Sequence, residues 1–190
     1  MKDAGKWITD AKPTYRALID QEHLVSKLYN MVNVPTGVWI NEQGRIVRPN
    51  EVAFVDERFK VFTGLDPAPY LNALRDWVEK GEKSPYIMTE DKLQQKLAPP
   101  DPNIAMASAE FGLGEQLYKS GHIAEAIPHF KEAQRLNPKS WNYKRQAYAL
   151  SSEKDYGTTF LQEVQKAGGS KVYYAHPDLP NPGEAQEKKP

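Results

Sequence analysis

The stretch that decides the fold of this chain is LIDQEHLVSKLYNMVNVPTGVWINEQGRIVRP, residues 18–49. Its second half contains two apolar runs, at 34–40 and 45–48, separated by an Asn-Glu-Gln-Gly turn at 41–44. Apolar runs divided by a turn of this composition predict an antiparallel β-hairpin. Pro35 stands near the start of the first run, where a strand tolerates the missing N–H.

A helix and a further strand are predicted upstream of this hairpin. Asp20 is a suitable N-cap, and the apolar residues that follow it recur at helical spacing up to Tyr29, so a helix ending near 30–33 is expected. The run Tyr15–Ile19 predicts a short, mostly buried strand. The predicted order is therefore strand, helix, strand, strand.

Composition excludes several classes of function. The 190 residues (21.6 kDa) carry 25 Lys+Arg and 25 Asp+Glu, and this balance argues against a nucleic-acid or anionic-membrane partner. The absence of cysteine excludes disulfides, thiol nucleophiles and thiolate metal sites. The four histidines belong to no metal-binding motif, so neither a metal nor another cofactor is predicted. No apolar span or signal peptide is recognisable, and a cytoplasmic location is the default expectation.

The order of elements around Val34-Pro35-Thr36 resembles the C-terminal half of the thioredoxin-like fold, in its redoxin or thiol–disulfide oxidoreductase branch. The resemblance covers about residues 2–49. It implies that Pro35 is cis, that Val34 offers its backbone to an extended substrate, and that Val34, Pro35 and Thr36 form a substrate edge. The alternative is an ordinary trans proline at the entry to a strand.

The chain departs from that family in one decisive respect. The family places a strand, a CxxC helix and a further strand before this half, and such a unit needs about 30 residues or more. The residues upstream of Pro35 are already assigned to other elements, and no cysteine is present. We therefore expect no redox activity from this chain alone. Three explanations stand: a piece of a longer chain that starts at an internal Met, which we favour; pairing of the exposed sheet edge with a second copy or a partner; or strands covered by the following helices.

A second motif follows in AEFGLGEQLYKSGHIAEAIPHFKEAQRLNP, residues 109–138. It resembles one tetratricopeptide repeat, because small, apolar and turn residues agree with the positions of that repeat of about 34 residues. The agreeing residues are Leu113, Gly114, Leu117, Gly121, Ala126, Phe130, Ala133 and Pro138. A generic helical hairpin is the alternative. Residues 141–150 predict a further amphipathic helix, and one repeat favours a small docking or dimerisation surface over a long groove.

The predicted fold class is α/β plus α: a partial thioredoxin-like fold (β-α-β-β) joined to an α-helical tetratricopeptide-like hairpin. The predicted divisions are a partial thioredoxin-like domain at 1–62, connecting helices and a Pro-rich linker at 63–102, the helical module at 103–170, and a Pro-rich, disordered tail at 171–190. Within the connecting region, Asp66 is expected to open a helix that Gly81 ends.

Two functional hypotheses follow. The first is the C-terminal portion of a redoxin-like protein that carries a helical protein-docking module and has no catalytic residue of its own. The second is a non-enzymatic scaffold for protein–protein interaction. Both expect a protein partner or a second copy at the sheet edge or at the helical module.

Overall fold

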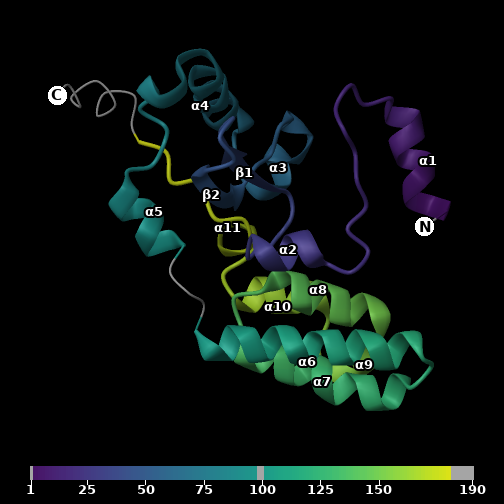
Figure 1. Ribbon diagram of the computed structural model, residues 1–190. Coiled ribbons are helices and arrows are strands. Elements are labelled where there is room, and N and C mark those ends of the chain that lie inside the picture. Colours follow the sequence, from purple (N-terminus) through teal and green to yellow (C-terminus); the bar gives the residue numbers. More distant parts are fainter. Residues whose placement is uncertain (1, 98–100, 181–190) are drawn as a thin grey trace.

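The computed structural model describes residues 2–97 and 101–180 (Figure 1). A small β-ribbon with its covering helices occupies one part of the molecule, and a group of helices from the second half of the chain occupies the other. In chain order the elements are α1 (Lys2–Ala11), α2 (Leu24–Leu28), β1 (Thr36–Ile40), β2 (Ile46–Val52), η1 (Glu57–Phe59), α3 (Lys60–Thr63), α4 (Pro67–Lys80), η2 (Gly81–Lys83), α5 (Glu90–Lys96), α6 (Pro102–Lys119), α7 (Ile123–Leu136), α8 (Trp141–Leu150), α9 (Glu153–Tyr156), α10 (Phe160–Lys166) and α11 (Ser170–Tyr173).

The predicted hairpin is confirmed as the antiparallel pair β1 and β2. The register pairs Thr36 with Val52 and Ile40 with Ile46, with irregularities on both sides of Trp39. The Asn41 side chain closes the turn, because its Oδ1 accepts hydrogen bonds from the backbone N–H groups of residues 43 and 45. The chain thus reverses where the sequence predicted it.

Helix α4 covers one face of the ribbon. It begins at the predicted N-cap, since the Asp66 carboxylate accepts a hydrogen bond from the backbone N–H of Ala68, and it ends at Gly81. Trp39 stacks on Trp77 at a centroid distance of 5.1 Å, and its indole N–H donates to the Tyr70 hydroxyl at 2.8 Å. This aromatic packing forms the core of the ribbon region.

A glycine on β1 makes this close packing possible. Gly37 and Trp39 both lie beside the Tyr70 hydroxyl. A Cβ atom at Gly37 would stand 2.2 Å from the Tyr70 hydroxyl oxygen. The strand can therefore approach α4 this closely only with glycine at that position.

Arg48 on β2 joins three parts of the chain. Its side chain is 2% exposed. Its guanidinium forms hydrogen bonds with both carboxylate oxygens of Glu51, at 2.8 and 3.1 Å, and also donates to the backbone carbonyls of Tyr86 and Asp178. The Asp178 N–H in turn donates to Glu51 at 3.2 Å. A buried cation therefore fastens the C-terminal segment to the ribbon.

For residues 171–180, this arrangement differs from the predicted disordered tail at 171–190. Helix α11 begins at Ser170, one residue before that range, Tyr173 is 5% exposed, and Leu179 packs against the cluster around Trp39. The partners of these residues lie far away in the sequence, so local composition did not reveal them. Residues 181–190, and residues 98–100 of the predicted Pro-rich linker, lie outside the described part of the chain.

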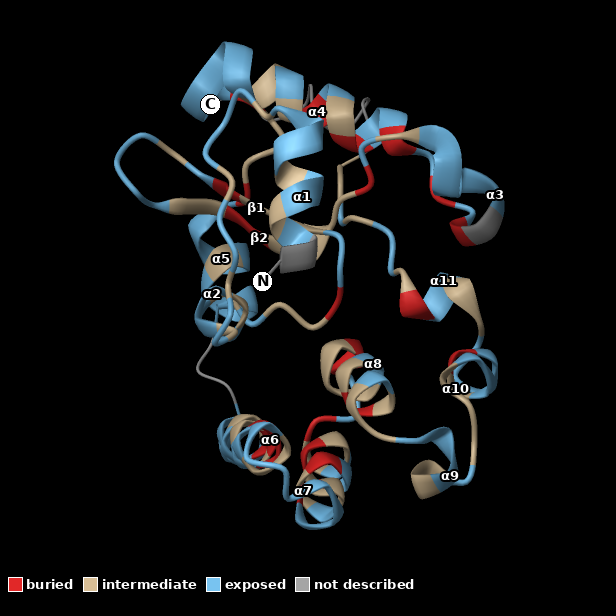
Figure 2. Ribbon diagram, turned by 90° about the vertical axis from the view of Figure 1, so that its right-hand side faces the viewer, coloured by how far each residue is buried: buried red, intermediate tan, exposed pale blue. Residues whose placement is uncertain are grey.

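Helices α6 and α7 form the predicted helical hairpin and pack with α8. Phe111, Ala126, Phe130, Ala133 and Ala147 are buried together, at 0 to 3% exposure. Figure 2 shows the buried segments of α6 and α7 facing each other. A Cβ at Gly114 would lie 2.7 Å from two ring carbons of Phe130, so glycine is needed at this helix crossing.

The predicted strand at Tyr15–Ile19 is wrong. Residues 15–19 have no regular secondary structure, and the side chains of Tyr15 and Leu18 are 76% and 82% exposed. Among the described residues the only sheet is the two-stranded one, so this run has no neighbouring strand to bond with. A strand gains stability from cross-strand pairs, and without them local apolar composition does not form one. The described part of the chain is therefore of mixed structure, mainly helical with a small antiparallel sheet.

Candidate protein-binding surfaces

The first candidate surface is the start of β1. The Val34–Pro35 peptide bond is cis, as the resemblance implies. Val34 is 49% exposed, and its backbone N–H is held by the Asn33 side-chain oxygen at 2.8 Å. The Pro35 carbonyl accepts a hydrogen bond from the Ala53 N–H at 3.2 Å, and the Thr36 hydroxyl donates to the Asn33 carbonyl at 2.5 Å. The three predicted substrate-edge residues thus adjoin one another in an accessible position.

The two edges of the ribbon differ. On β2, the Val47 carbonyl accepts a hydrogen bond from the Met88 N–H at 3.0 Å, so the loop after η2 covers part of its outer side. On β1, no segment within 2–97 or 101–180 adds a strand. A strand edge without a neighbour presents backbone donors and acceptors to any extended chain that reaches it.

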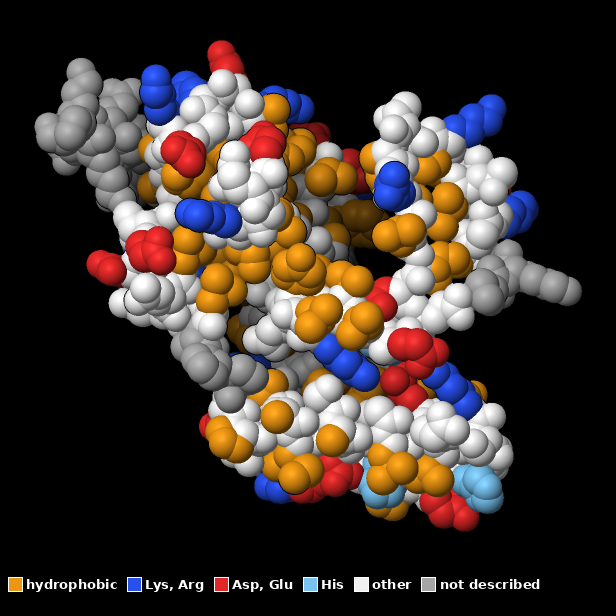
Figure 3. All heavy atoms as spheres, viewed as in Figure 1, with side chains coloured by type: hydrophobic (Ala, Val, Ile, Leu, Met, Phe, Trp, Pro, Cys, Tyr) orange, Lys and Arg blue, Asp and Glu red, His pale blue; other side chains and the backbone are white. Residues whose placement is uncertain are grey.

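Exposed apolar side chains gather upstream of this edge, in residues 2–32, which we call the N-terminal arm. Figure 3 shows hydrophobic side chains over α1 and α2 on the face drawn. The large apolar residues of the arm that are at least 42% exposed are Trp7, Tyr15, Leu18, Ile19, Leu24, Val25 and Leu28. So many exposed apolar groups in one segment are typical of an interaction surface.

The second candidate surface is the side of α6 and α8 on which the arm lies. Asn142, at the start of α8, donates its backbone N–H to the Val32 carbonyl at 3.1 Å and its side-chain amide to the Met31 carbonyl at 2.5 Å. On α6, Glu115 pairs with the His23 imidazole at 3.1 Å. Lys119 lies 3.7 Å from the Glu22 carboxylate. Polar contacts therefore hold the arm against the helices.

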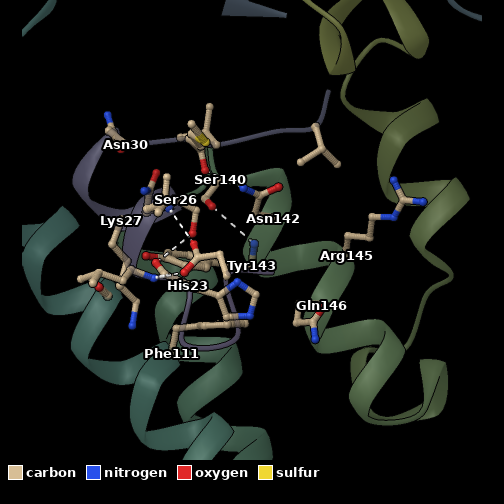
Figure 4. A pocket seen from close by; sticks show the side chains of 18 of the residues that line it. His23, Ser26, Lys27, Asn30, Phe111, Ser140, Asn142, Tyr143, Arg145 and Gln146 are labelled. Carbon is tan, nitrogen blue, oxygen red and sulfur yellow. Dashed lines mark hydrogen bonds between the residues drawn. The ribbon is translucent and has the colours of Figure 1, made fainter. Parts of the chain in front are cut away.

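A cavity of about 870 Å³ remains between the arm and the helices. Its lining combines apolar residues with a few polar ones, as is common in ligand-binding and peptide-binding sites. Figure 4 shows His23 of the arm close to Tyr143 and Gln146 of α8. The lining includes Leu18, Ile19, Leu24, Ile104, Phe111 and Ala149. The arm thus covers this face of α6 and α8 without filling it.

His23 is one of the titratable groups that line the cavity. Its hydrogen bond to Glu115 raises the pKa of His23 above the ordinary value of 6.5, partial burial opposes this shift, and the charge of Glu115 adds to it. Glu115 itself is 8% exposed. Burial also raises the pKa of the nearby Tyr143 hydroxyl, against a hydrogen bond from Ser108 that lowers it. The imidazolium form of His23 is therefore favoured beside a buried carboxylate.

The predicted repeat-packing residues are mostly brought together. Gly114, Ala126, Phe130 and Ala133 are buried, and Leu117 packs against them. Gly121 has a φ of 85° in the turn after α6. Pro138 follows the end of α7 and is exposed. A proline that ends a helix does not need to be buried. Leu113 is the exception: it is 46% exposed and lies outside the hairpin core.

Sequence reasoning missed Arg48, Asn142 and the pair of His23 with Glu115. Each depends on contacts between segments far apart in the chain, so local spacing gave no signal for them. The aromatic run after Ser140 predicted a helix but not that its first turn would bind the backbone of the arm.

No group of three metal-ligating side chains occurs within the described ranges. In the same ranges, no helix has the length and hydropathy required to cross a bilayer. No protein-family model matches the sequence, and the searches of curated proteins and solved structures also gave no match. The functional argument therefore rests on the geometry of these two surfaces.

Proposed function

We propose that this chain is the C-terminal, substrate-holding portion of a redoxin-like protein, with a helical module that docks it to other protein. In this role the free edge of β1, entered through Val34, Pro35 and Thr36, binds an extended polypeptide. The chain contributes recognition only, because it contains no cysteine. The helix, the Val-Pro-Thr entry and the ribbon agree with this proposal, whereas the irregular run at 15–19 departs from it.

The observation that carries the proposal is the unpaired edge of β1 next to the exposed Val34. An added strand would form main-chain hydrogen bonds along β1 while its side chains contact the adjoining surface. The side chains of Val38 and Ile46 line a further hollow of about 280 Å³ beside α2 and α5.

The direct test uses reduced, carboxymethylated ribonuclease as a permanently extended polypeptide. We expect its binding to slow amide hydrogen exchange in residues 34–40. Val34→Asp should weaken this binding about tenfold, because a carboxylate is placed where an apolar contact forms, a change worth about 1.4 kcal/mol. Val61→Asp is the matched control, since Val61 is 99% exposed on α3.

Failure of the test takes a clear form. If saturating ribonuclease leaves exchange at 34–40 unchanged, or if both valine variants bind equally well, the edge is not the binding surface. A disulfide-reduction assay with the chain and a dithiol should give only the background rate. A rate above background would show that the chain itself carries a redox-active group.

A non-enzymatic scaffold is the second candidate. It is favoured by the self-contained core of α6, α7 and α8 and by the failure of residues 15–19 to form a strand. The nucleotide sequence upstream of Met1 separates the two candidates. A strand and a reactive CxxC-like motif in the same frame support the redoxin portion, and an immediate stop codon supports the scaffold.

A further inference from the structure

We propose that Asn33 is a positioning residue of the β1 edge and makes Val34 a hydrogen-bond acceptor only. In this role the Val34 carbonyl accepts a hydrogen bond from the bound polypeptide, while the Val34 N–H takes no part. Asn33 has this role only where the β1 edge binds an extended polypeptide, so the role rests on the proposed function. Hydrogen bonds within the chain, just before β1 begins, leave this one backbone group for a ligand.

The Val34 N–H is already engaged within the chain. It donates to the side-chain oxygen of Asn33 at 2.8 Å. Asn33 is 5% exposed, and its side-chain nitrogen donates to the carbonyl of Tyr173 in α11. Both ends of this buried amide therefore have partners, which fixes its oxygen toward Val34. Because a residue has one backbone donor, the Val34 N–H is not available to a second acceptor.

Aromatic packing holds the other end of this contact. Tyr173 is 5% exposed and lies against two rings of the second half of the chain. Its ring centroid is 5.0 Å from that of Trp141 in α8 and 5.9 Å from that of Phe160 in α10. The carbonyl to which Asn33 donates is therefore part of a packed cluster of three helices. This cluster sets the position of Asn33 and, through it, the orientation of the backbone at Val34.

The backbone carbonyls on both sides of Val34 accept hydrogen bonds from the chain itself. In residues 31–33, two carbonyls accept from Asn142, through its side chain and its N–H, and the third accepts from the Thr36 hydroxyl. After Val34, the Pro35 carbonyl accepts from the backbone N–H of residue 53 at 3.2 Å. The carbonyls that flank Val34 are therefore committed to the fold.

The carbonyl of Val34 differs from these neighbours. Within residues 2–97 and 101–180, no hydrogen-bond donor of the chain reaches it. Val34 is 49% exposed, so an extended polypeptide can approach it from outside. A backbone acceptor that the fold does not use can pair with an N–H of an added strand without breaking a bond within the chain. At Val34 the edge therefore accepts a hydrogen bond and does not donate one.

The first measurement needs no variant and uses NMR to follow amide hydrogen exchange at single residues of the full chain. The Val34 amide should exchange slowly in the free chain, and saturating carboxymethylated ribonuclease should leave its rate unchanged. Any slowing on binding should come from residues 36–40, and the carbonyl resonance of Val34 should shift. If ribonuclease slows the Val34 amide as much as it slows residues 36–40, the acceptor-only assignment is overturned.

Asn33→Ala then tests the positioning residue, with Asn142→Ala as the matched control. Asn142 ties the same segment to the helices through the Met31 carbonyl but is not bonded to Val34. Asn33→Ala should make the Val34 amide of the free chain exchange about tenfold faster, because the N–H loses its hydrogen bond. Ribonuclease should then slow this amide, as it does not in the wild type. Asn142→Ala should leave the Val34 amide as in the wild type.

The outcomes separate this role from the proposed function. Equal acceleration of the Val34 amide in both asparagine variants would mean that Asn33 acts only through general stability, and the positioning role would be overturned. Slowing of residues 36–40 together with Val34 in the wild type would leave the edge as the binding surface and remove the role of Asn33. If ribonuclease slows no amide in residues 34–40, the proposed function fails and the role of Asn33 fails with it.

Discussion

The helical module and the N-terminal arm use apolar residues in opposite ways. In the module, Phe111 and Phe130 are 3% and 0% exposed and lie 5.3 Å apart between ring centroids, against small residues that let the helices approach. In the arm, Leu18 and Leu28 are 82% and 73% exposed, and the contacts with α6 and α8 are polar. The comparison shows that one part completes its hydrophobic core within the chain and the other does not.

The ribbon region lies between these two extremes. Its aromatic core is small, and the buried Arg48 adds a polar connection to the C-terminal segment. Substitutions in the three regions should therefore lower the free energy of unfolding by different amounts, and these differences can be measured.

The largest effect is expected from Arg48→Met. The change removes the cation and leaves the Glu51 carboxylate, whose side chain is 8% exposed, buried without its partner. Loss of one member of a buried ion pair costs about 3–5 kcal/mol. Urea unfolding should show this decrease in the free energy of unfolding, with faster hydrogen exchange in residues 174–180.

The matched control for Arg48 is Arg58→Met. Arg58 pairs with Asp56 at 2.7 Å, but its side chain is 82% exposed. Fully exposed ion pairs add little to stability, so this variant should stay close to the wild type. If both arginine variants lower the free energy of unfolding by the same amount, the role assigned to Arg48 is contradicted.

Gly114→Ala should have the next largest effect. The new Cβ would lie 2.7 Å from the Phe130 ring, which is fully buried. Overpacking of this kind costs about 1–3 kcal/mol, part of which is offset by the better helix propensity of alanine. Thermal and urea unfolding should both show the loss.

Gly112→Ala gives the comparison within the same helix. The nearest atom to its new Cβ is the Lys27 ammonium nitrogen, at 3.9 Å. Without a clash, alanine should stabilise α6 by about 0.5–1 kcal/mol. If Gly114→Ala lowers the free energy of unfolding and Gly112→Ala raises it, the packing assigned to α6 and α7 is supported. If both variants lower it, the loss at Gly114 does not come from the contact with Phe130.

These contrasts also mark what the sequence could predict. The hairpin at β1 and β2 and the crossing at Gly114 depend on residues close together in the chain, and both were predictable. The irregular conformation of residues 15–19 was not predictable, because a strand needs a neighbouring strand and local composition does not show whether one is present. The ordered conformation of residues 174–180 depends on contacts between segments far apart in the sequence. The pairing of His23 with Glu115 depends on such contacts too. The arm as a binding element could therefore be identified only from the structure.

The pH dependence of stability should report the contact between the arm and α6. The hydrogen bond to Glu115 raises the pKa of His23 above 6.5 in the folded chain, with Asp20 adding to the shift and Lys27 opposing it. The contribution of the His23–Glu115 pairing to the free energy of unfolding is therefore fully present below pH 6.5. It is lost as the pH rises through the raised pKa of His23. Because the His23 side chain is 41% exposed, we expect a loss below about 1 kcal/mol.

His23→Gln isolates this contribution. The difference in the free energy of unfolding between wild type and variant should shrink from the acidic to the basic side of neutrality. Titration of the imidazole resonances by NMR should place the His23 pKa above 6.5. A His23 pKa at or below that value, or a difference that does not change with pH, would contradict the pairing with Glu115.

The smallest effect is expected in the arm itself, from Leu24→Ser and Leu28→Ser. The two side chains are 59% and 73% exposed, so serine removes little buried apolar area. Each variant should change the free energy of unfolding by no more than about 0.5 kcal/mol. Leu65→Ser, at a leucine that is 5% exposed, is the buried control and should cost several times more. A comparable loss at Leu24 would mean that the arm is already packed in the free chain, and the contrast between arm and module would then disappear.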